Sequence, residues 1–204
     1  MKIRRYILVI LTLSLVMLST PGRSYSEEAA GKAGDEEYEV ISTLVEFYYG
    51  SDLDLILIAE KTEPWCVVIH LSELKVKWKE LENETFDSLI ERNREYTILE
   101  KKFKIETEYR LISKADYISV LGDSLSPDWD NFDKIYPETS GVLIISRVGM
   151  DPEGSQALIY FCNAYRCSDD KIVPKHRSIA FLIREDSKWK LEGIERGFRA
   201  FSAY

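Results

Sequence analysis

The stretch that decides the fold runs from Gly141 to Trp189. It begins with Gly141-Val-Leu-Ile-Ile-Ser-Arg-Val-Gly149, turns at Met150-Asp-Pro-Glu-Gly154 and continues with Ser155-Gln-Ala-Leu-Ile-Tyr-Phe-Cys162. A third apolar run starts at Ser178 after a polar loop, and a fourth follows the polar turn at 185–188. Short β-branched and aromatic runs bounded by Asp, Pro, Gly and Ser are typical of strands joined by hairpins. The stretch predicts an antiparallel meander of four strands, with a bulge or bend at Gly193 where the alternation fails.

The chain before this stretch predicts mostly helices. Apolar residues recur three and four positions apart from Tyr38 to Tyr48, which indicates a helix that ends at Gly50. The apolar runs 53–59 and 65–71 predict two strands that pair with each other, and shorter helices are expected at 84–94, 114–121 and 127–136. Helices followed by strands indicate an α+β fold. We expect an antiparallel sheet, made of the meander and one or two N-terminal strands, with helices packed on one face.

Residues 1–26 have the organisation of a secretory signal peptide. Lys2, Arg4 and Arg5 precede an apolar run, and small residues occupy positions 24 and 26. An uncleaved N-terminal anchor is the alternative. Residues 27–37 are acidic and carry no large apolar side chain, so a disordered leader is expected there. Residues 38–204 are then a single α+β domain.

The charge limits the partners that we expect. Removal of residues 1–26 would lower the formal net charge from −8 to −12, because four positive and no negative residues would be lost. An acidic surface repels phosphate backbones and anionic lipid. The sequence therefore predicts an exported protein, periplasmic or extracellular, with no nucleic-acid partner and no stable membrane insertion after the signal is removed.

Three cysteines occur in a chain that is expected to leave the cytosol, where disulfides can form. Cys162 and Cys167 enclose four residues at the mouth of a predicted loop, and we expect a disulfide between them that fixes this loop. Cys66 is then left over, as a buried thiol that behaves as a small apolar side chain.

The candidate ligand-binding residues are Ser146, Arg147 and His176. Ser146 and Arg147 interrupt an apolar strand, so their polar groups must be hydrogen-bonded or face a cavity. An arginine paired with a nearby carboxylate is the structural interpretation, and an arginine in an open pocket is the functional one. His176 lies in a loop between cationic residues. No pattern of metal ligands or cofactor motif appears, so neither a metal nor a cofactor is expected, and no catalytic residue is identified.

Two further features weigh on the function. Trp129 is surrounded by four acidic residues, Asp123, Asp128, Asp130 and Asp133, but the glycine and terminal glutamate of a calcium loop are missing. N-capping and a solvated helix face explain these residues better.

The chain resembles a family of uncharacterised bacterial exported proteins at three stretches: Ser146-Arg-Val-Gly-Met150, Gln156-Ala-Leu-Ile-Tyr160 and Asp186-Ser-Lys-Trp189. The helix-then-sheet order is also similar to cone-shaped nuclear-transport-factor-2-like folds. The first resemblance implies a fold and no catalytic residues.

The function predicted from the sequence is that of an exported, non-catalytic module that binds a partner protein or a small ligand. The alternative is a small hydrolase-like enzyme with its pocket around Arg147 in a cone-shaped α+β fold, and a third possibility is a protein of envelope structure. The surroundings of Arg147 discriminate between these hypotheses. A deep cavity lined by Arg147 and an unpaired acid would favour the enzyme, and a filled sheet face would disfavour it.

Overall fold

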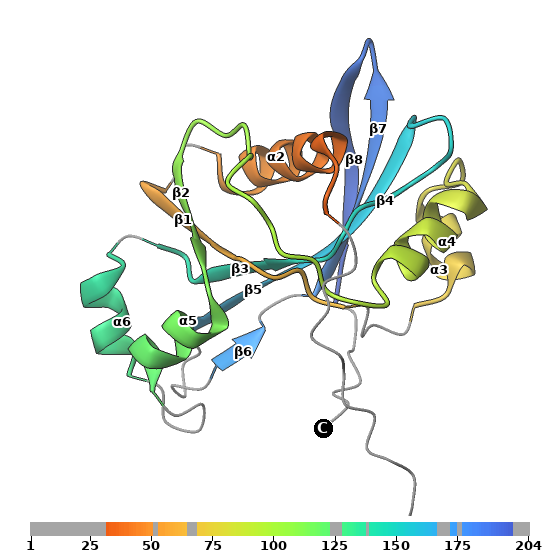
Figure 1. Cartoon of the computed structure of the whole chain (residues 1–204). Coiled ribbons are helices and arrows are strands. Elements are labelled where there is room, and N and C mark those ends of the chain that lie inside the picture. The colour runs from red at the N-terminus through yellow and green to blue at the C-terminus, as the bar shows by residue number, and fades with distance from the viewer. Residues whose placement is uncertain are drawn as a thin grey trace, which may run out of the picture.

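The protein folds around one mixed β-sheet, seen in the computed structural model of Figure 1. The structure describes residues 32–50, 53–64, 69–122, 128–137, 139–166, 172–174 and 177–197. Within these residues the strand order is β2-β1-β3-β5-β7-β8, and the short strands β4 and β6 both pair with β5. The expected signal peptide and residues 27–31 of the expected leader lie outside the described residues.

The C-terminal half of the sheet is the predicted antiparallel meander, and this prediction is confirmed. Each strand pairs with the next in antiparallel register, in the order β3 (Val142–Ile145), β5 (Gln156–Arg166), β7 (Ser178–Glu185) and β8 (Lys188–Arg196). Strands β4 (Gly149–Met150) and β6 (Ile172–Pro174) flank β5. The β7–β8 register shifts between Phe181 and Leu182, opposite Gly193, where the bulge was expected.

The prediction of a purely antiparallel sheet was wrong. Strand β1 (Leu55–Ala59) lies between β2 (Glu108–Ile112) and β3, and both pairings are parallel. Parallel neighbours require a long crossover, and short helices supply it. Helices α3 (Leu71–Lys77) and α4 (Asn83–Arg92) connect β1 to β2, and α5 (Lys114–Leu121) and α6 (Trp129–Ile135) connect β2 to β3. Of these helices, α3 was not predicted from the sequence.

Strands β2 and β3 are the neighbours of β1, and no described residue of the run 65–71 pairs with β1. Residues 65–68 lie outside the described residues, Ile69 and His70 are not in a strand, and Leu71 begins α3. Ile69 is buried in a cluster with Leu74 and Leu158. Ile69 and Leu71 are apolar because this end of the run enters the core at the start of a helix. A short apolar run alone does not distinguish this from a strand.

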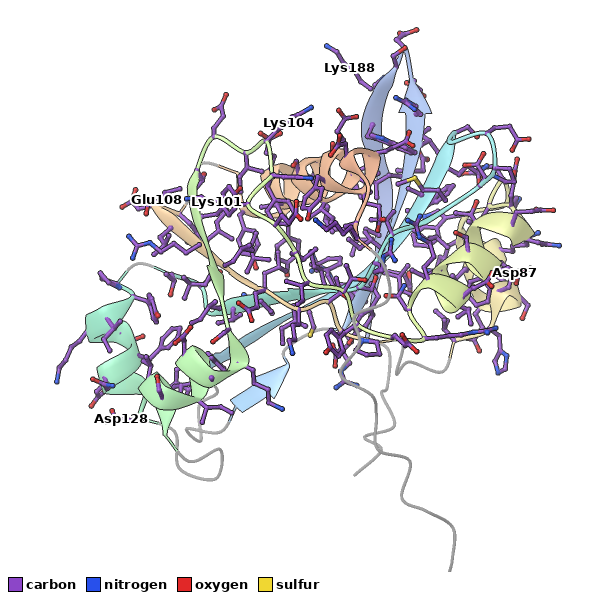
Figure 2. All side chains as sticks on the ribbon, in the orientation of Figure 1. Asp87, Lys101, Lys104, Glu108, Asp128 and Lys188 are labelled. Atoms are coloured by element: carbon purple, nitrogen blue, oxygen red, sulfur yellow. The ribbon has the colours of Figure 1, made fainter. Side chains whose placement is uncertain are left out.

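Helices cover both faces of the sheet, so the prediction of one covered face was also wrong. Helix α2 (Asp35–Tyr49) packs on one face, in a core cluster that it shares with β1, β3, β5 and β7. On the other face α3 and α4 cover β5 and β7, and α5 and α6 cover β1 and β3. Figure 2 shows side chains filling the space between α2 and the sheet, with charged residues such as Asp87 and Lys188 at the periphery.

Helix α2 begins earlier than the sequence suggested. Asp35 is its first residue, whereas residues up to 37 were expected to belong to a disordered leader. Gly34 is the N-cap, and its amide donates to Glu37 Oε1 at 3.1 Å. Three acidic residues occupy the first turn, where the helix dipole favours negative charge. The acidic composition that suggested a leader therefore marks the start of a helix.

Candidate functional site

Ser146 lies where strand β3 ends, and its polar atoms are satisfied by the backbone. Its amide donates to the carbonyl of Tyr160 at 2.8 Å, and its hydroxyl accepts from the Tyr160 amide at 3.0 Å. The same hydroxyl donates to the carbonyl of Arg147 at 2.7 Å. Ser146 is fully buried. Its hydroxyl thus stands in for a backbone carbonyl where the β3–β5 ladder breaks, and this use is structural.

Arg147 forms a buried ion pair with Glu37. Arg147 Nη2 lies 2.7 Å from Glu37 Oε1, and Arg147 Nε lies 3.4 Å from Glu37 Oε2. The two residues are 9 % and 2 % exposed. The Val148 amide also donates to Glu37 Oε2, at 3.3 Å. A two-point contact of this kind satisfies the planar guanidinium and the carboxylate together.

A second arginine completes this cluster. Arg92, the last residue of α4, donates to Glu37 Oε1 through Nη2. Burial lowers the pKa of Arg92, and the charge of Arg147 adds to this effect while Glu37 opposes it. We call Glu37, Arg92 and Arg147 the arginine–glutamate cluster. It joins the first turn of α2, the end of α4 and the break between β3 and β4.

Asn93 fixes the backbone at the same break. Its Oδ1 accepts from the Arg147 amide at 2.7 Å, and its Nδ2 donates to the Arg147 carbonyl at 3.0 Å. Asn93 is buried, and Nδ2 also donates to the carbonyl of Leu89. Neither Asn93 nor Glu37 was expected at this site, because each lies far from Arg147 along the chain.

Only two of the three predicted ligand-binding residues are described, and the contacts of these two are structural. The polar groups of Ser146 and Arg147 form hydrogen bonds within the fold. His176 lies outside the described residues. The surroundings of Arg147 correspond to the structural interpretation, an arginine held by a carboxylate. The alternative of an enzyme with its pocket around Arg147 loses its main support.

The predicted disulfide is corrected by the position of Cys162. Cys162 is a buried thiol in strand β5, and its Sγ lies 3.9 Å from Glu63 Oε2. The loop was expected to begin at Cys162, but β5 continues to Arg166. An extended strand advances about 3.3 Å per residue, so the α-carbon of Arg166 lies about 13 Å from the α-carbon of Cys162. Disulfide α-carbons are usually less than about 7 Å apart. Cys66 and Cys167 lie outside the described residues.

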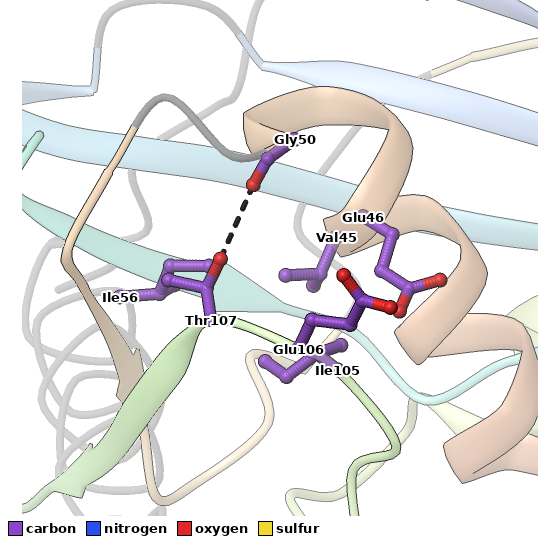
Figure 3. Close-up of a pocket in the computed structure, with 7 residues that line it drawn as sticks. All are labelled: Val45, Glu46, Gly50, Ile56, Ile105, Glu106 and Thr107. Carbon is purple, nitrogen blue, oxygen red and sulfur yellow. Dashed lines mark hydrogen bonds between the residues drawn. The ribbon is translucent and has the colours of Figure 1, made fainter.

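A pocket of about 420 Å³ opens at the C-terminal end of α2. Its wall comes from three segments that are distant in the sequence: the end of α2, strand β1, and the segment that leads into β2 (Figure 3). The lining residues are Val45, Glu46, Gly50, Ile56, Ile105, Glu106 and Thr107. The volume lies within the range of small-molecule sites.

Gly50 shapes one side of this pocket. It is the C-cap of α2 with φ 54°, a backbone conformation that glycine adopts without strain. Its amide donates to the carbonyl of Glu46 at 2.8 Å, and its carbonyl accepts from Thr107 Oγ1 at 3.2 Å (Figure 3). The hydroxyl of Thr107 therefore ties the segment before β2 to the end of the helix.

Two carboxylates give the pocket its charge. Glu46 in the last turn of α2 and Glu106 before β2 are both exposed, and Figure 3 shows their carboxylates pointing toward each other. Neither forms an ion pair with a basic side chain of the described residues. The last turn of α2 contains no basic residue, although the helix dipole places negative potential there. An acidic residue in a last helical turn that contains no basic residue was the one signal in the sequence that could have indicated this site.

A second acidic group surrounds the β4–β5 turn. Carboxylate oxygens of Glu82, Asp151 and Glu153 lie within 4.8 Å of one another. Local desolvation, followed by the charges of Asp151 and Glu153, raises the pKa of Glu82. Asp151 already accepts from the Ser155 amide at 2.9 Å, the Ser155 hydroxyl at 2.9 Å and the Gln156 amide at 2.5 Å. These bonds close the turn, so Asp151 has a structural use without a cation.

The acidic residues around Trp129 have a structural use where they are described. Asp128 is the N-cap of α6, and its Oδ1 accepts from the Asn131 amide at 2.9 Å. Asp123 lies outside the described residues. The N-capping interpretation is therefore confirmed for Asp128.

Comparisons with known proteins leave the family open. No family model, no curated protein and no solved structure matches this chain. The resemblances noted in the sequence therefore stay expectations. Among the described residues no helix is both long and apolar enough to cross a membrane.

Proposed function

We propose that this protein is a non-catalytic binding domain whose pocket at the C-terminal end of α2 holds a positively charged group. The observation that carries the proposal is the pair of carboxylates, Glu46 and Glu106, that line the pocket and point toward each other without a basic partner among the described residues. A cation between them would gain from both charges and from the negative end of the helix dipole.

The position of Glu46 supports a role in binding rather than in stability. A carboxylate in the last turn of a helix destabilises the helix by roughly 0.3–1 kcal/mol. Residues that violate such local rules are expected mainly at functional sites.

Calorimetric titration with n-butylammonium chloride tests the proposal, and sodium butyrate at equal ionic strength is the matched anion. Saturable binding is expected for the cation and none for butyrate. Replacing one exposed ion-pair partner typically costs up to about 1 kcal/mol, so Glu46→Gln and Glu106→Gln should each weaken binding up to about five-fold. Binding should also weaken as salt is raised.

The matched control is Glu73→Gln. Glu73 is an exposed acid in the first turn of α3 and does not line the pocket. It removes the same charge and should leave the affinity for butylammonium unchanged. Equal binding of butyrate, or an affinity that neither pocket variant changes, would overturn the proposal.

We further propose that the protein acts outside the cytosol, supported by the order of cationic, apolar and small residues in positions 1–26. A mature chain that begins close to Glu27 is expected. Intact-mass measurement of protein recovered from its native compartment checks this, and a mass that retains residues 1–26 would favour the membrane-anchored alternative.

A further inference from the structure

The pocket has an apolar side in addition to its acidic one. Val45 and Ile56 are buried members of the main core cluster, and Ile105 packs against that cluster while half-buried. All three line the pocket together with the carboxylates. Ile105 therefore offers accessible apolar surface, with Val45 and Ile56 forming the floor behind it. A bare inorganic cation would leave this surface in contact with water.

The described side chains that line the pocket offer mainly hydrogen-bond acceptors. Glu46 and Glu106 contribute carboxylates, and the hydroxyl of Thr107 already donates to the carbonyl of Gly50. A ligand must therefore bring donors. A primary ammonium carries three N–H donors, whereas a quaternary ammonium carries none and is usually held by aromatic rings. Among the described residues that line the pocket none is aromatic, so they offer no ring on which a guanidinium could stack.

We propose that the ligand is a primary ammonium at the end of an aliphatic chain, as a free alkylamine or a lysine side chain carries it. The ammonium lies between Glu46 and Glu106, and the methylene groups lie along Ile105. This proposal rests on the proposed function, because it names the chemistry of the cation that the pocket holds.

A chain-length series tests the aliphatic part. The probes are ammonium, methylammonium, ethylammonium and n-butylammonium chlorides at constant ionic strength. Full burial of one methylene corresponds to about a four-fold gain in affinity, so partial burial should give about a two- to four-fold gain for each methylene that is added. Ile105→Ala should flatten this series and leave the affinity for ammonium itself unchanged. Ile98→Ala is the control, because Ile98 is exposed and does not line the pocket.

A head-group series tests the ammonium. Tetramethylammonium and n-butylguanidinium should each bind up to about five-fold more weakly than n-butylammonium, since each loses an interaction worth up to about 1 kcal/mol. Nα-acetyl-lysine methylamide presents the same head group on a peptide. If it binds at least as tightly as n-butylammonium, the source is a lysine side chain, and if only the free amines bind, the source is a small alkylamine.

The outcomes separate the two proposals. If none of the cations binds, the proposed function fails. If all of them bind with equal affinity and Glu46→Gln weakens each one, the cation site stands and the aliphatic chain is wrong. If tetramethylammonium or butylguanidinium binds as tightly as butylammonium, the primary ammonium is wrong. Circular dichroism of Ile105→Ala and thermal unfolding establish that this variant is folded before its series is interpreted.

Discussion

Glu37 and Arg147 lie 110 residues apart in the sequence and form a buried ion pair, with Glu37 Oε1 2.7 Å from Arg147 Nη2. Glu37 belongs to the first turn of α2, and Arg147 belongs to the break between β3 and β4. Arg92 donates to the same carboxylate from the end of α4. One carboxylate therefore anchors helices on opposite faces of the sheet, and α2 carries the pocket at its other end.

The first prediction concerns this ion pair. Arg147→Ala should lower the free energy of unfolding by about 3 to 5 kcal/mol, because loss of one partner leaves a buried charge under-compensated. The retained contact to Arg92 places the expected loss near the lower value. Urea unfolding measures it. Arg110→Ala is the control, since Arg110 pairs with Glu108 at the exposed surface, where loss of a pair costs about 1 kcal/mol or less. An unfolding midpoint of Arg147→Ala equal to that of the parent would contradict the structural role.

The second prediction concerns the close approach of β4 and α4. A Cβ at Gly149 would lie 2.4 Å from the backbone nitrogen of Leu89, so strand or helix would have to move. Gly149→Ala should destabilise the fold by about 1 to 3 kcal/mol, as overpacking does. A Cβ at Gly34 would meet no atom within 4 Å, and Gly34→Ala should change stability by less than about 1 kcal/mol. Equal melting temperatures for the two variants would contradict this packing.

The third prediction concerns Tyr117. Its hydroxyl is buried and has no hydrogen-bond partner among the residues that the structure describes, and burial raises its pKa to about 12. Between pH 10 and 12 the unfolded state would hold fewer protons than the folded state. Stability should therefore fall as the pH rises, by up to about 1.4 kcal/mol per pH unit.

Tyr117→Phe should reduce this alkaline loss and leave stability at pH 7 unchanged or raised by about 1 kcal/mol, because an unpaired buried hydroxyl is removed. Tyr38→Phe is the opposite control. The hydroxyl of Tyr38 accepts from the Glu100 amide at 2.7 Å, so its removal should destabilise the protein. Urea unfolding at pH 7 and pH 11 measures both variants, and an unchanged pH dependence of Tyr117→Phe would contradict the assignment.

The sequence predicted those parts of the fold in which neighbouring segments pair. The meander, the Gly193 bulge and the Gly50 cap all follow from local alternation and turn chemistry. The parallel pairing of β1 with β2 joins Leu55 to Glu108, and no local pattern encodes a partner at that separation. The run 65–71 was then the nearest apolar candidate for a partner of β1, and the antiparallel prediction followed from it.

The candidate site was missed for a similar reason. Ser146 and Arg147 were conspicuous because polar residues interrupted an apolar strand, but the cause of that interruption is Glu37, which the acidic composition of its segment concealed. The pocket draws Glu46, Ile56 and Glu106 from three segments. None of these residues forms a recognisable motif with its neighbours in the sequence. Only the folded chain places the two acids beside one apolar wall.

The last prediction separates stability from binding at Glu46. Its carboxylate lies in the last turn of α2, where the negative end of the helix dipole disfavours it. Glu46→Gln should therefore raise the free energy of unfolding by about 0.3–1 kcal/mol, while weakening the binding of butylammonium. Glu73→Gln removes the same charge from the first turn of α3, where the dipole favours it. This variant should lose a similar amount of stability and keep its affinity. Urea unfolding and calorimetric titration of the two variants, side by side at low salt, check both signs. A destabilised Glu46→Gln variant would mean that Glu46 is held by a stabilising contact within the protein, and the argument that its position serves a ligand would then fail.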